Sequence, residues 1–106
     1  MNVERISFVR TPTYDLHTYY DSKLRKTREE YYTLEGDWQK QKEGWFAREF
    51  TYDRYGNIEW IRYYDRKNDL ALLKANYAQH RRLYNARRQV VRGEFYGVNG
   101  EPVLCA

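Results

Sequence analysis

The chain repeats itself with a period of 32 residues and without gaps. A fixed period of this size is typical of repeat architectures, in which one supersecondary unit is copied and each copy covers the apolar face of the next. The period therefore predicts the fold, whereas function depends on surface residues that differ between copies. The aligned fragments are Tyr20-Asp21, Tyr52-Asp53 and Tyr84-Asn85, followed by Tyr31-Tyr32, Tyr63-Tyr64 and Phe95-Tyr96.

The middle copy shows the expected unit most clearly. Aromatic and polar residues alternate over residues 48–52, turn residues follow at 53–57, and a second β-rich run covers 58–64. Gly56 permits the positive φ that a tight reversal needs, and Asp53 can bond nearby backbone amides through its side chain. This pattern predicts a β-hairpin.

Strict alternation along the second strand of that hairpin places Ile58 and Trp60 on one face and Ile61 and Tyr63 on the other. Both faces carry rings, so we expect both to be partly covered. A tyrosine that recurs at the same place in every copy is what packing between copies requires. The recurring tyrosines are therefore expected to be a structural ladder.

One segment favours a helix on propensity alone. Residues 69–88 are rich in Ala, Leu, Lys, Gln and Arg, and their apolar positions fall at helical spacing. One repeat should have one fold, so a strand is favoured for the part aligned with residues 48–52. We expect an all-β, antiparallel meander of about three 32-residue hairpin repeats, with a short helix in each linker as the alternative.

The length of 106 residues indicates a single domain. Its expected units are a degenerate first copy at 1–43, a second copy at 44–75 and a third, incomplete copy at 76–106. Because the third copy stops after its last short strand, we expect an open sheet edge.

Composition argues against several classes of function. A single cysteine, Cys105, rules out an internal disulfide, and with two histidines the usual ligands of a structural zinc site are too few. No cofactor and no catalysis are expected, since carboxylate pairs such as Glu29 with Glu30, or Asp65 with Asp69, come with no sign of a pocket. No segment is apolar enough for a membrane span or a signal peptide. Cellular location therefore stays open.

The fragments at residues 52–57, 63–65 and 95–104 resemble the tandem Tyr-Asp repeats of bacterial surface and secreted proteins and, more loosely, the YD repeats of RHS proteins. The resemblance implies an all-β fold, a surface or secreted location, and binding or envelope functions without catalytic residues. A phage-encoded cytoplasmic protein is the alternative. Asn85, Arg88 and Asn76 depart from the pattern and put the first turn of the third copy in doubt.

Candidate functional residues are those that do not repeat. The arginine cluster of the third copy can bind phosphates or carboxylates, unless acids of the second copy balance it. Tryptophans and a tyrosine at a turn tip can bind a partner's surface. These candidates are Arg81, Arg82, Arg87, Arg88, Arg92, Trp38, Trp60 and Tyr55, and Trp45 is a further ring outside the repeated columns.

Three hypotheses of function follow. The first is a non-catalytic module that binds a protein, or a second copy of itself, through an open sheet edge and exposed aromatic and arginine side chains. The second is binding of a polyanion, nucleic acid or acidic glycan, by the arginines of residues 81–92. The third is recognition of a neutral sugar by the rings.

Overall fold

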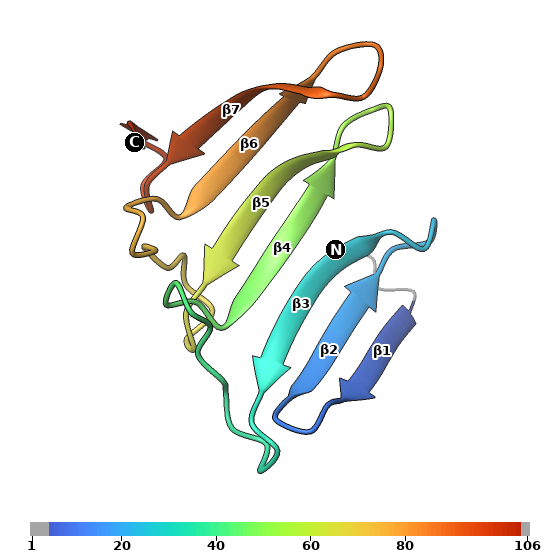
Figure 1. The fold of residues 1–106 in the computed structure, drawn as a ribbon, viewed down its shortest axis with the longest axis vertical. Coiled ribbons are helices and arrows are strands. Elements are labelled where there is room, and N and C mark those ends of the chain that lie inside the picture. The colour runs from blue at the N-terminus through green and yellow to red at the C-terminus, as the bar shows by residue number, and fades with distance from the viewer. Residues whose placement is uncertain (1–4, 105–106) are drawn as a thin grey trace.

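Eight antiparallel strands form a single sheet in the computed structural model, which describes residues 5–104 (Figure 1). Their order in the sheet is their order in the chain, so the predicted all-β antiparallel meander is confirmed. The strands are β1 (Arg5–Arg10), β2 (Asp15–Tyr20), β3 (Lys26–Tyr32), β4 (Ala47–Tyr52), β5 (Ile58–Tyr64), β6 (Gln79–Tyr84), β7 (Val90–Tyr96) and β8 (Pro102–Val103).

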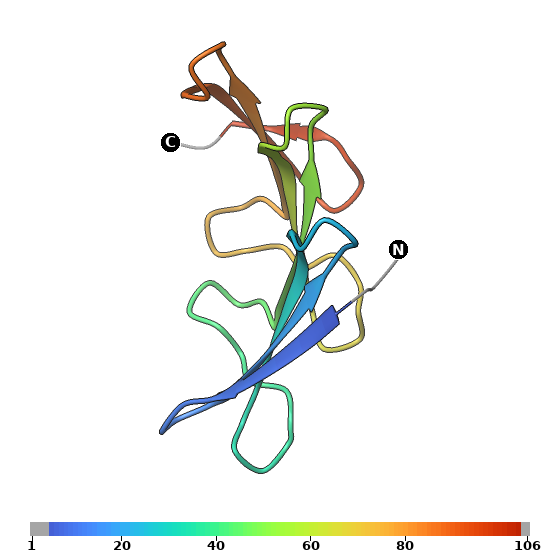
Figure 2. The same ribbon diagram turned by 90° about the vertical axis from the view of Figure 1, so that its right-hand side faces the viewer.

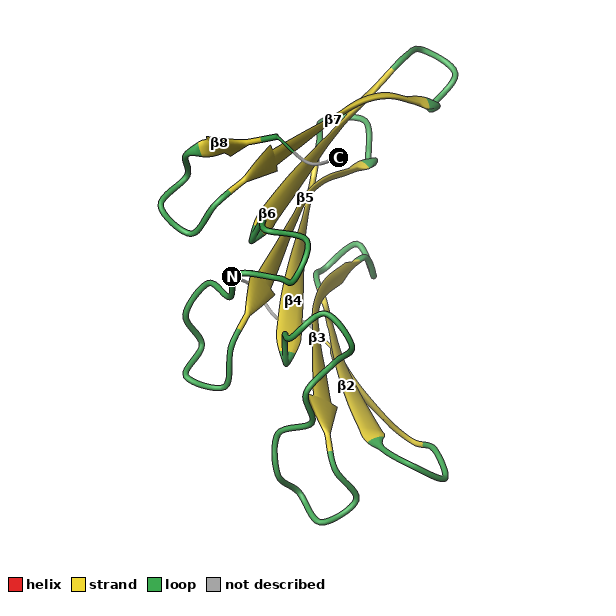
Figure 3. Ribbon diagram, turned by 60° about the vertical axis from the view of Figure 1, so that its left-hand side comes forward, coloured by secondary structure: helices red, strands yellow, loops and turns green. Residues whose placement is uncertain are grey.

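No helix occurs in the part of the chain that the structure describes (Figure 3). Residues 69–88, where propensity favours a helix, form an irregular linker, β6 and a hairpin turn. Pairing with β5 overrides helix propensity there, so the alternative of a short linker helix is wrong for residues 5–104. Accordingly, these residues include no helix that could cross a membrane. Cys105 lies outside the described residues.

Three hairpins follow one another at a constant interval: the first hairpin (β2 and β3), the second (β4 and β5) and the third (β6 and β7). Their first strands begin at residues 15, 47 and 79, and their second strands begin at 26, 58 and 90. Six residue pairs are in register within each hairpin, but only three pairs join one hairpin to the next. Each hairpin is thus attached to its neighbour along a short seam.

An Asp or Asn side chain closes each hairpin turn. In the second hairpin, Oδ1 of Asp53 accepts the backbone N–H of Tyr55 at 2.9 Å and that of Asn57 at 3.0 Å. Asp21 and Asn85 accept the same two bonds in the other turns. Asn therefore replaces Asp at the third turn without loss of the motif, because its carbonyl oxygen accepts the same bonds.

A β-bulge at the same place in each hairpin changes which face a side chain occupies. Thr51 lies opposite Trp60 and Tyr52 lies opposite Ile58, so one residue, Glu59, is extra. The extra residue turns Ile58 to the face of Ile61, where it packs against the core. The expectation that Ile58 shares a face with Trp60 is therefore wrong.

Aromatic rings form a continuous ladder across the hairpins on that apolar face. Successive rings come alternately from strands and from the segments that connect strands, and their centroids lie 4.7–6.2 Å apart. Each such contact is worth about 0.5–1.5 kcal/mol beyond the area it buries. The recurring rings thus pack between hairpins. The ladder runs Tyr14, Tyr31, Trp45, Tyr63, Tyr77 and Phe95.

The core is small and lies under the linkers. Residues 39–45 and 71–77 lie on one side of the sheet, which is seen edge-on in Figure 2. From these linkers Trp45 and Leu73 pack against Phe50, Ile61 and Tyr63 of the second hairpin, and all five are less than 9% exposed. Trp45 therefore belongs to the core rather than to a surface that a ligand could reach.

Near the hairpin tips, a hydrogen bond from a tyrosine hydroxyl joins each hairpin to the preceding one. The hydroxyl of Tyr52 donates to the backbone carbonyl of Lys26, and that of Tyr84 donates to the carbonyl of Ile58, both at 2.6 Å. Tyr52 and Tyr84 stand 32 residues apart, and so do their acceptors. The same contact thus joins the first hairpin to the second and the second to the third.

Each hairpin turn also places one residue in the left-handed region, and replacing Leu24 by Gly tests its cost. Leu24, Gly56 and Arg88 occupy this position with φ of +61°, +87° and +62°. A residue with a Cβ loses about 1–2 kcal/mol there, which exceeds the entropic cost of Gly. Because Leu24 is 62% exposed, Leu24→Gly should raise the free energy of unfolding by about 0.5–1 kcal/mol, measured by urea denaturation.

The matched control is Gly56→Leu, which should destabilise the equivalent turn. Equal stability of the wild type and both variants would show that this turn position carries no strain.

Candidate functional site

The five arginines of the third hairpin do not form one surface. Arg81 lies opposite Glu94 and Arg82 lies opposite Gly93, so these neighbours on β6 occupy opposite faces. Arg88 belongs to the turn before β7, whereas Arg92 lies within β7. The cluster thus divides into a paired group and an unpaired group.

Arg81 and Arg92 form the paired group. Arg81 binds Glu59 of the second hairpin at 2.8 Å and lies 3.6 Å from Glu94. Arg92 binds Glu94 at 3.1 Å. For these two arginines the alternative of a balanced, solvated face is the better description.

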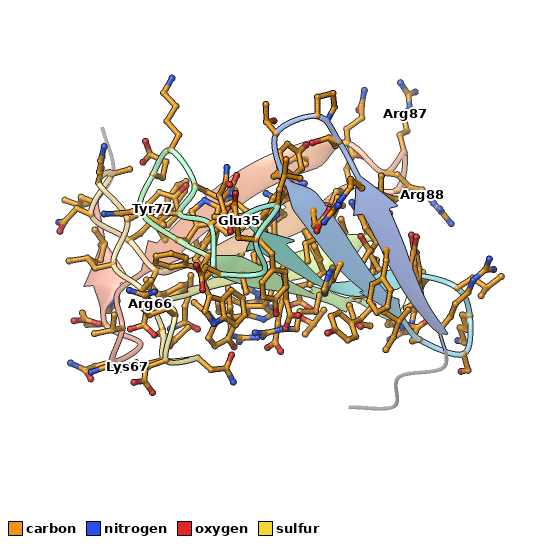
Figure 4. All side chains as sticks on the ribbon, turned by 90° about the horizontal axis from the view of Figure 1, so that it is seen from below. Glu35, Arg66, Lys67, Tyr77, Arg87 and Arg88 are labelled. Atoms are coloured by element: carbon orange, nitrogen blue, oxygen red, sulfur yellow. The ribbon has the colours of Figure 1, made fainter. Side chains whose placement is uncertain are left out.

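Arg82, Arg87 and Arg88 form the unpaired group. Their guanidinium groups make no hydrogen bond or ion pair within residues 5–104. In Figure 4, Arg87 and Arg88 project away from the sheet at one end of the molecule. Burial opposes ionisation of Asp53, but the hydrogen bonds of its own turn and then the charge of Arg88 outweigh it and lower the pKa of that carboxyl. Free guanidinium groups are available to carboxylate or phosphate oxygens.

The candidate rings differ in exposure. Tyr55 is 65% exposed at the tip of the second hairpin, with the guanidinium of Arg54 at 5.1 Å from its ring centroid. Trp60 is half-buried, with the Arg62 guanidinium 4.4 Å above it, and Trp38 stacks on a neighbouring tyrosine. Tyr55 is therefore the ring best placed to meet a partner.

A groove lies between the tips of the second and third hairpins, and it collects several of these residues. Its volume is about 680 Å³, and Tyr55, Arg82 and Arg88 line it together with Arg54 and Glu59. Arg54 was not among the residues expected from the sequence. Arg54 lies in the turn of the second copy, and only the fold brings that turn beside the arginines of the third copy.

A network of charged and phenolic side chains covers the face opposite the ring ladder. At its centre Arg28, 8% exposed, donates to Glu30 at 2.7 Å and to Glu49 at 3.1 Å. The hydroxyls of Tyr19 and Tyr32 also donate to Glu30, at 2.8 and 2.9 Å. No buried side-chain polar atom in the described residues lacks a partner. Such completeness is typical of a structural network.

The pKa values of Tyr19, Tyr32 and Glu30 in this network are shifted away from neutral pH. Burial and the hydrogen bond to Glu30 raise the pKa of Tyr19 to about 12, and the same two causes raise the pKa of Tyr32. Burial opposes ionisation of Glu30, but hydrogen bonds from Arg28, Tyr19 and Tyr32 outweigh it and lower the pKa of that carboxyl. General acid–base chemistry favours groups with a pKa near the operating pH, and the shifts of Tyr19, Tyr32 and Glu30 lead away from it.

The other candidate acids and bases are likewise occupied. Glu29 and Glu30 are adjacent on β3 and so lie on opposite faces, where Glu29 binds Arg48 at 2.7 Å. Asp65 accepts the backbone N–H of Asp69 within a turn. His80 stacks on Phe95 at 4.5 Å. In the described range no three His, Cys, Asp or Glu side chains gather as possible metal ligands.

We expect acid to destabilise the fold through Glu29 and Glu30. Burial opposes their ionisation, but contacts with Arg48 and Arg28 outweigh it, so their folded pKa values lie below the ordinary value of 4.5. The stability that these groups contribute is therefore complete above pH 4.5 and declines as the pH falls through their folded pKa values. The urea midpoint should be lower at pH 3 than at pH 7.

The variant Glu30→Gln should be less stable at pH 7 and should lose less stability on acidification. A midpoint that is the same at both pH values in the wild type would contradict this assignment.

Comparisons with protein-family models, with curated proteins and with solved structures found no match. The likeness to tandem Tyr-Asp repeats therefore stays a prediction from the sequence.

Proposed function

We propose that this chain is a non-catalytic protein-binding module that engages its partner through the outer edge of β7. The observation that carries the proposal is an uncovered strand edge. On its outer side β7 pairs with β8 only at Phe95 and Tyr96, and no other strand among residues 5–104 covers positions 90–93. A bare strand edge is a template for another strand.

The equivalent edges of the first and second hairpins each pair with the next strand of the sheet. Residues 28–30 of β3 pair with β4, and residues 60–62 of β5 pair with β6. The corresponding positions on β7 are 92–94, one 32-residue interval further along. Val90 and Val91 beside them are 53% and 62% exposed. This backbone geometry and exposed apolar surface support binding of a partner's strand.

A second exposed edge lies at the opposite side of the sheet, on β1. Ile6, Phe8 and Val9 are 46%, 69% and 49% exposed there. Two strand edges with exposed apolar side chains also favour self-association, so a second copy of the chain is as good a partner as another protein. In either case Tyr55 and the unpaired arginines would meet the partner's surface near the hairpin tips.

We further propose that the three hairpins are tandem Tyr-Asp repeats. The two residues of that motif have separate tasks here, which supports the assignment. The tyrosine fastens one hairpin to the preceding one, as at Tyr52 and Tyr84, and the following Asp or Asn closes the turn. Both tasks recur at the repeat interval.

Replacing Val91 by Lys tests the edge. A charged side chain on an edge strand opposes further pairing, so Val91→Lys should weaken partner binding by about tenfold or more while leaving the fold intact. Val98→Lys is the matched control, because Val98 is an exposed valine outside the edge. The partner is identified by affinity capture on the immobilised chain, and its purified form is titrated against both variants.

Self-association is measured on the same proteins by light scattering over a range of concentrations. If the chain stays monomeric and its partner binds Val91→Lys as it binds the wild type, the proposal fails.

Polyanion binding by the third hairpin is a second candidate, favoured by the guanidinium groups of Arg82, Arg87 and Arg88, which have no hydrogen-bond or ion-pair partner among residues 5–104. In a gel-shift series, the chain should then bind a single-stranded DNA probe more weakly as the salt concentration rises. The logarithm of the binding constant should fall against the logarithm of the salt concentration with a slope of about −0.7 for each neutralised phosphate. The double variant Arg87→Gln/Arg88→Gln should reduce that slope more than Lys23→Gln/Lys42→Gln, which removes the same charge elsewhere. An absent shift at low salt ends this candidate.

A further inference from the structure

Two grooves with the same architecture lie between successive hairpins. The first groove lies between the first and second hairpins and has a volume of about 480 Å³, with Arg25, Thr27 and Tyr52 in its lining. The second groove is the one of about 680 Å³ between the second and third hairpins. Its lining includes positions 32 residues further along, among them Glu59 and Tyr84.

The grooves exist because the hairpins diverge toward their tips, as Figure 1 shows. Between β5 and β6, pairing covers only residues 60–62 and 79–81. Beyond these pairs, residues 82–84 of β6 pair with no residue of β5. The hydroxyl of Tyr84 bridges the gap to the carbonyl of Ile58. Bare strand backbone therefore borders the second groove.

The first groove carries as many acidic as basic side chains, since Asp21 and Glu49 line it together with Lys23 and Arg25. Its Arg25 binds Asp21 at 2.9 Å and lies 4.5 Å above the ring of Tyr52. Its Glu49 accepts hydrogen bonds from Arg28 and from the hydroxyl of Tyr64. This groove has no excess of either sign.

The charges of the second groove are not balanced in this way. Asp53 accepts hydrogen bonds from its own turn, and Glu59 binds Arg81. Arg54, Arg82 and Arg88 line the same groove, and their guanidinium groups have no hydrogen-bond acceptor in the structured part of the chain. The second groove thus contains two carboxylates that have hydrogen-bond partners and three guanidinium groups that have none among the described residues.

We infer that the second groove binds an extended acidic peptide segment of the partner protein. This inference rests on the proposed protein-binding function and names the chemistry of the partner. The peptide's carboxylates bind Arg54 and Arg82 from opposite walls, with Arg88 at the rim, and its backbone lies along residues 82–84 of β6. Guanidinium groups form paired hydrogen bonds with carboxylates, and an uncovered strand edge bonds an extended backbone.

A peptide fits the groove better than a single-stranded nucleic acid does. Nucleic acids bind such sites by stacking several bases on aromatic side chains. The second groove offers Tyr55, which already carries the guanidinium of Arg54, and Tyr84, whose hydroxyl is tied to Ile58. Backbone hydrogen-bonding groups of a strand edge are complementary to a peptide instead.

Fluorescein-labelled octaglutamate is the probe, titrated by anisotropy with the full chain. Arg54→Gln/Arg82→Gln should weaken its binding by about tenfold or more, since each hydrogen bond to a charged group contributes a factor of that order. Lys23→Gln/Lys42→Gln is the control of equal charge, with Lys23 in the first groove, and should change binding less than about threefold. Arg82→Lys keeps the charge but loses the paired geometry, so it should also weaken binding.

Absent octaglutamate binding, or equal weakening by the groove and control variants, would overturn the inference. Tighter binding of a deoxythymidine octamer through the same arginines would also overturn it, in favour of a polyanion. Urea denaturation confirms that each variant is folded before it is titrated. Val91→Lys tests the β7 edge separately. If Val91→Lys loses partner binding but the wild-type chain does not bind octaglutamate, the proposed function stands and only this inference fails.

Discussion

The contact between neighbouring hairpins is the constraint on which this structure depends. Only three residue pairs join one hairpin to the next, and a seam this short needs support from side chains. The ring ladder supplies that support on one face, and the hydroxyls of Tyr52 and Tyr84 supply it near the tips. A thin sheet can be held together in this way because a tyrosine packs its ring and bonds its hydroxyl at once.

The short seams also give rise to the surfaces on which the proposed binding depends. Where pairing stops, the strands diverge and a groove opens, and where no further hairpin follows in the described residues, the edge of β7 is bare. The acids near these surfaces have partners inside the molecule, as Glu59 has in Arg81. The guanidinium group of Arg82, by contrast, has no hydrogen-bond or ion-pair partner among residues 5–104. Contacts within the molecule thus account for these carboxylates, and the proposed binding site uses the guanidinium groups that remain.

Local pattern was a good guide to the hairpins and a poor one to side-chain direction. Asn85 and Arg88 put the third hairpin turn in doubt, yet that turn forms, because Asn accepts the bonds of Asp and the fold imposes a left-handed φ on Arg88. Strict alternation of side chains puts Ile58 on the wrong face, because that pattern does not reveal a β-bulge. Trp45 looked like a surface candidate, but it packs into the core from a linker whose path no local signal predicts.

The sequence by itself determined the 32-residue interval and the hairpin turns, because these depend on residues close in the chain. For β6, by contrast, local propensity favours a helix, and pairing with β5 makes it a strand. Only the tertiary structure decided which arginines are free. Arg81 is neutralised by Glu59, 22 residues earlier, whereas Arg82, its neighbour in the chain, points to the other face. Arg54 and Arg82 line one groove for the same reason, since the seam between hairpins sets their distance and local sequence does not.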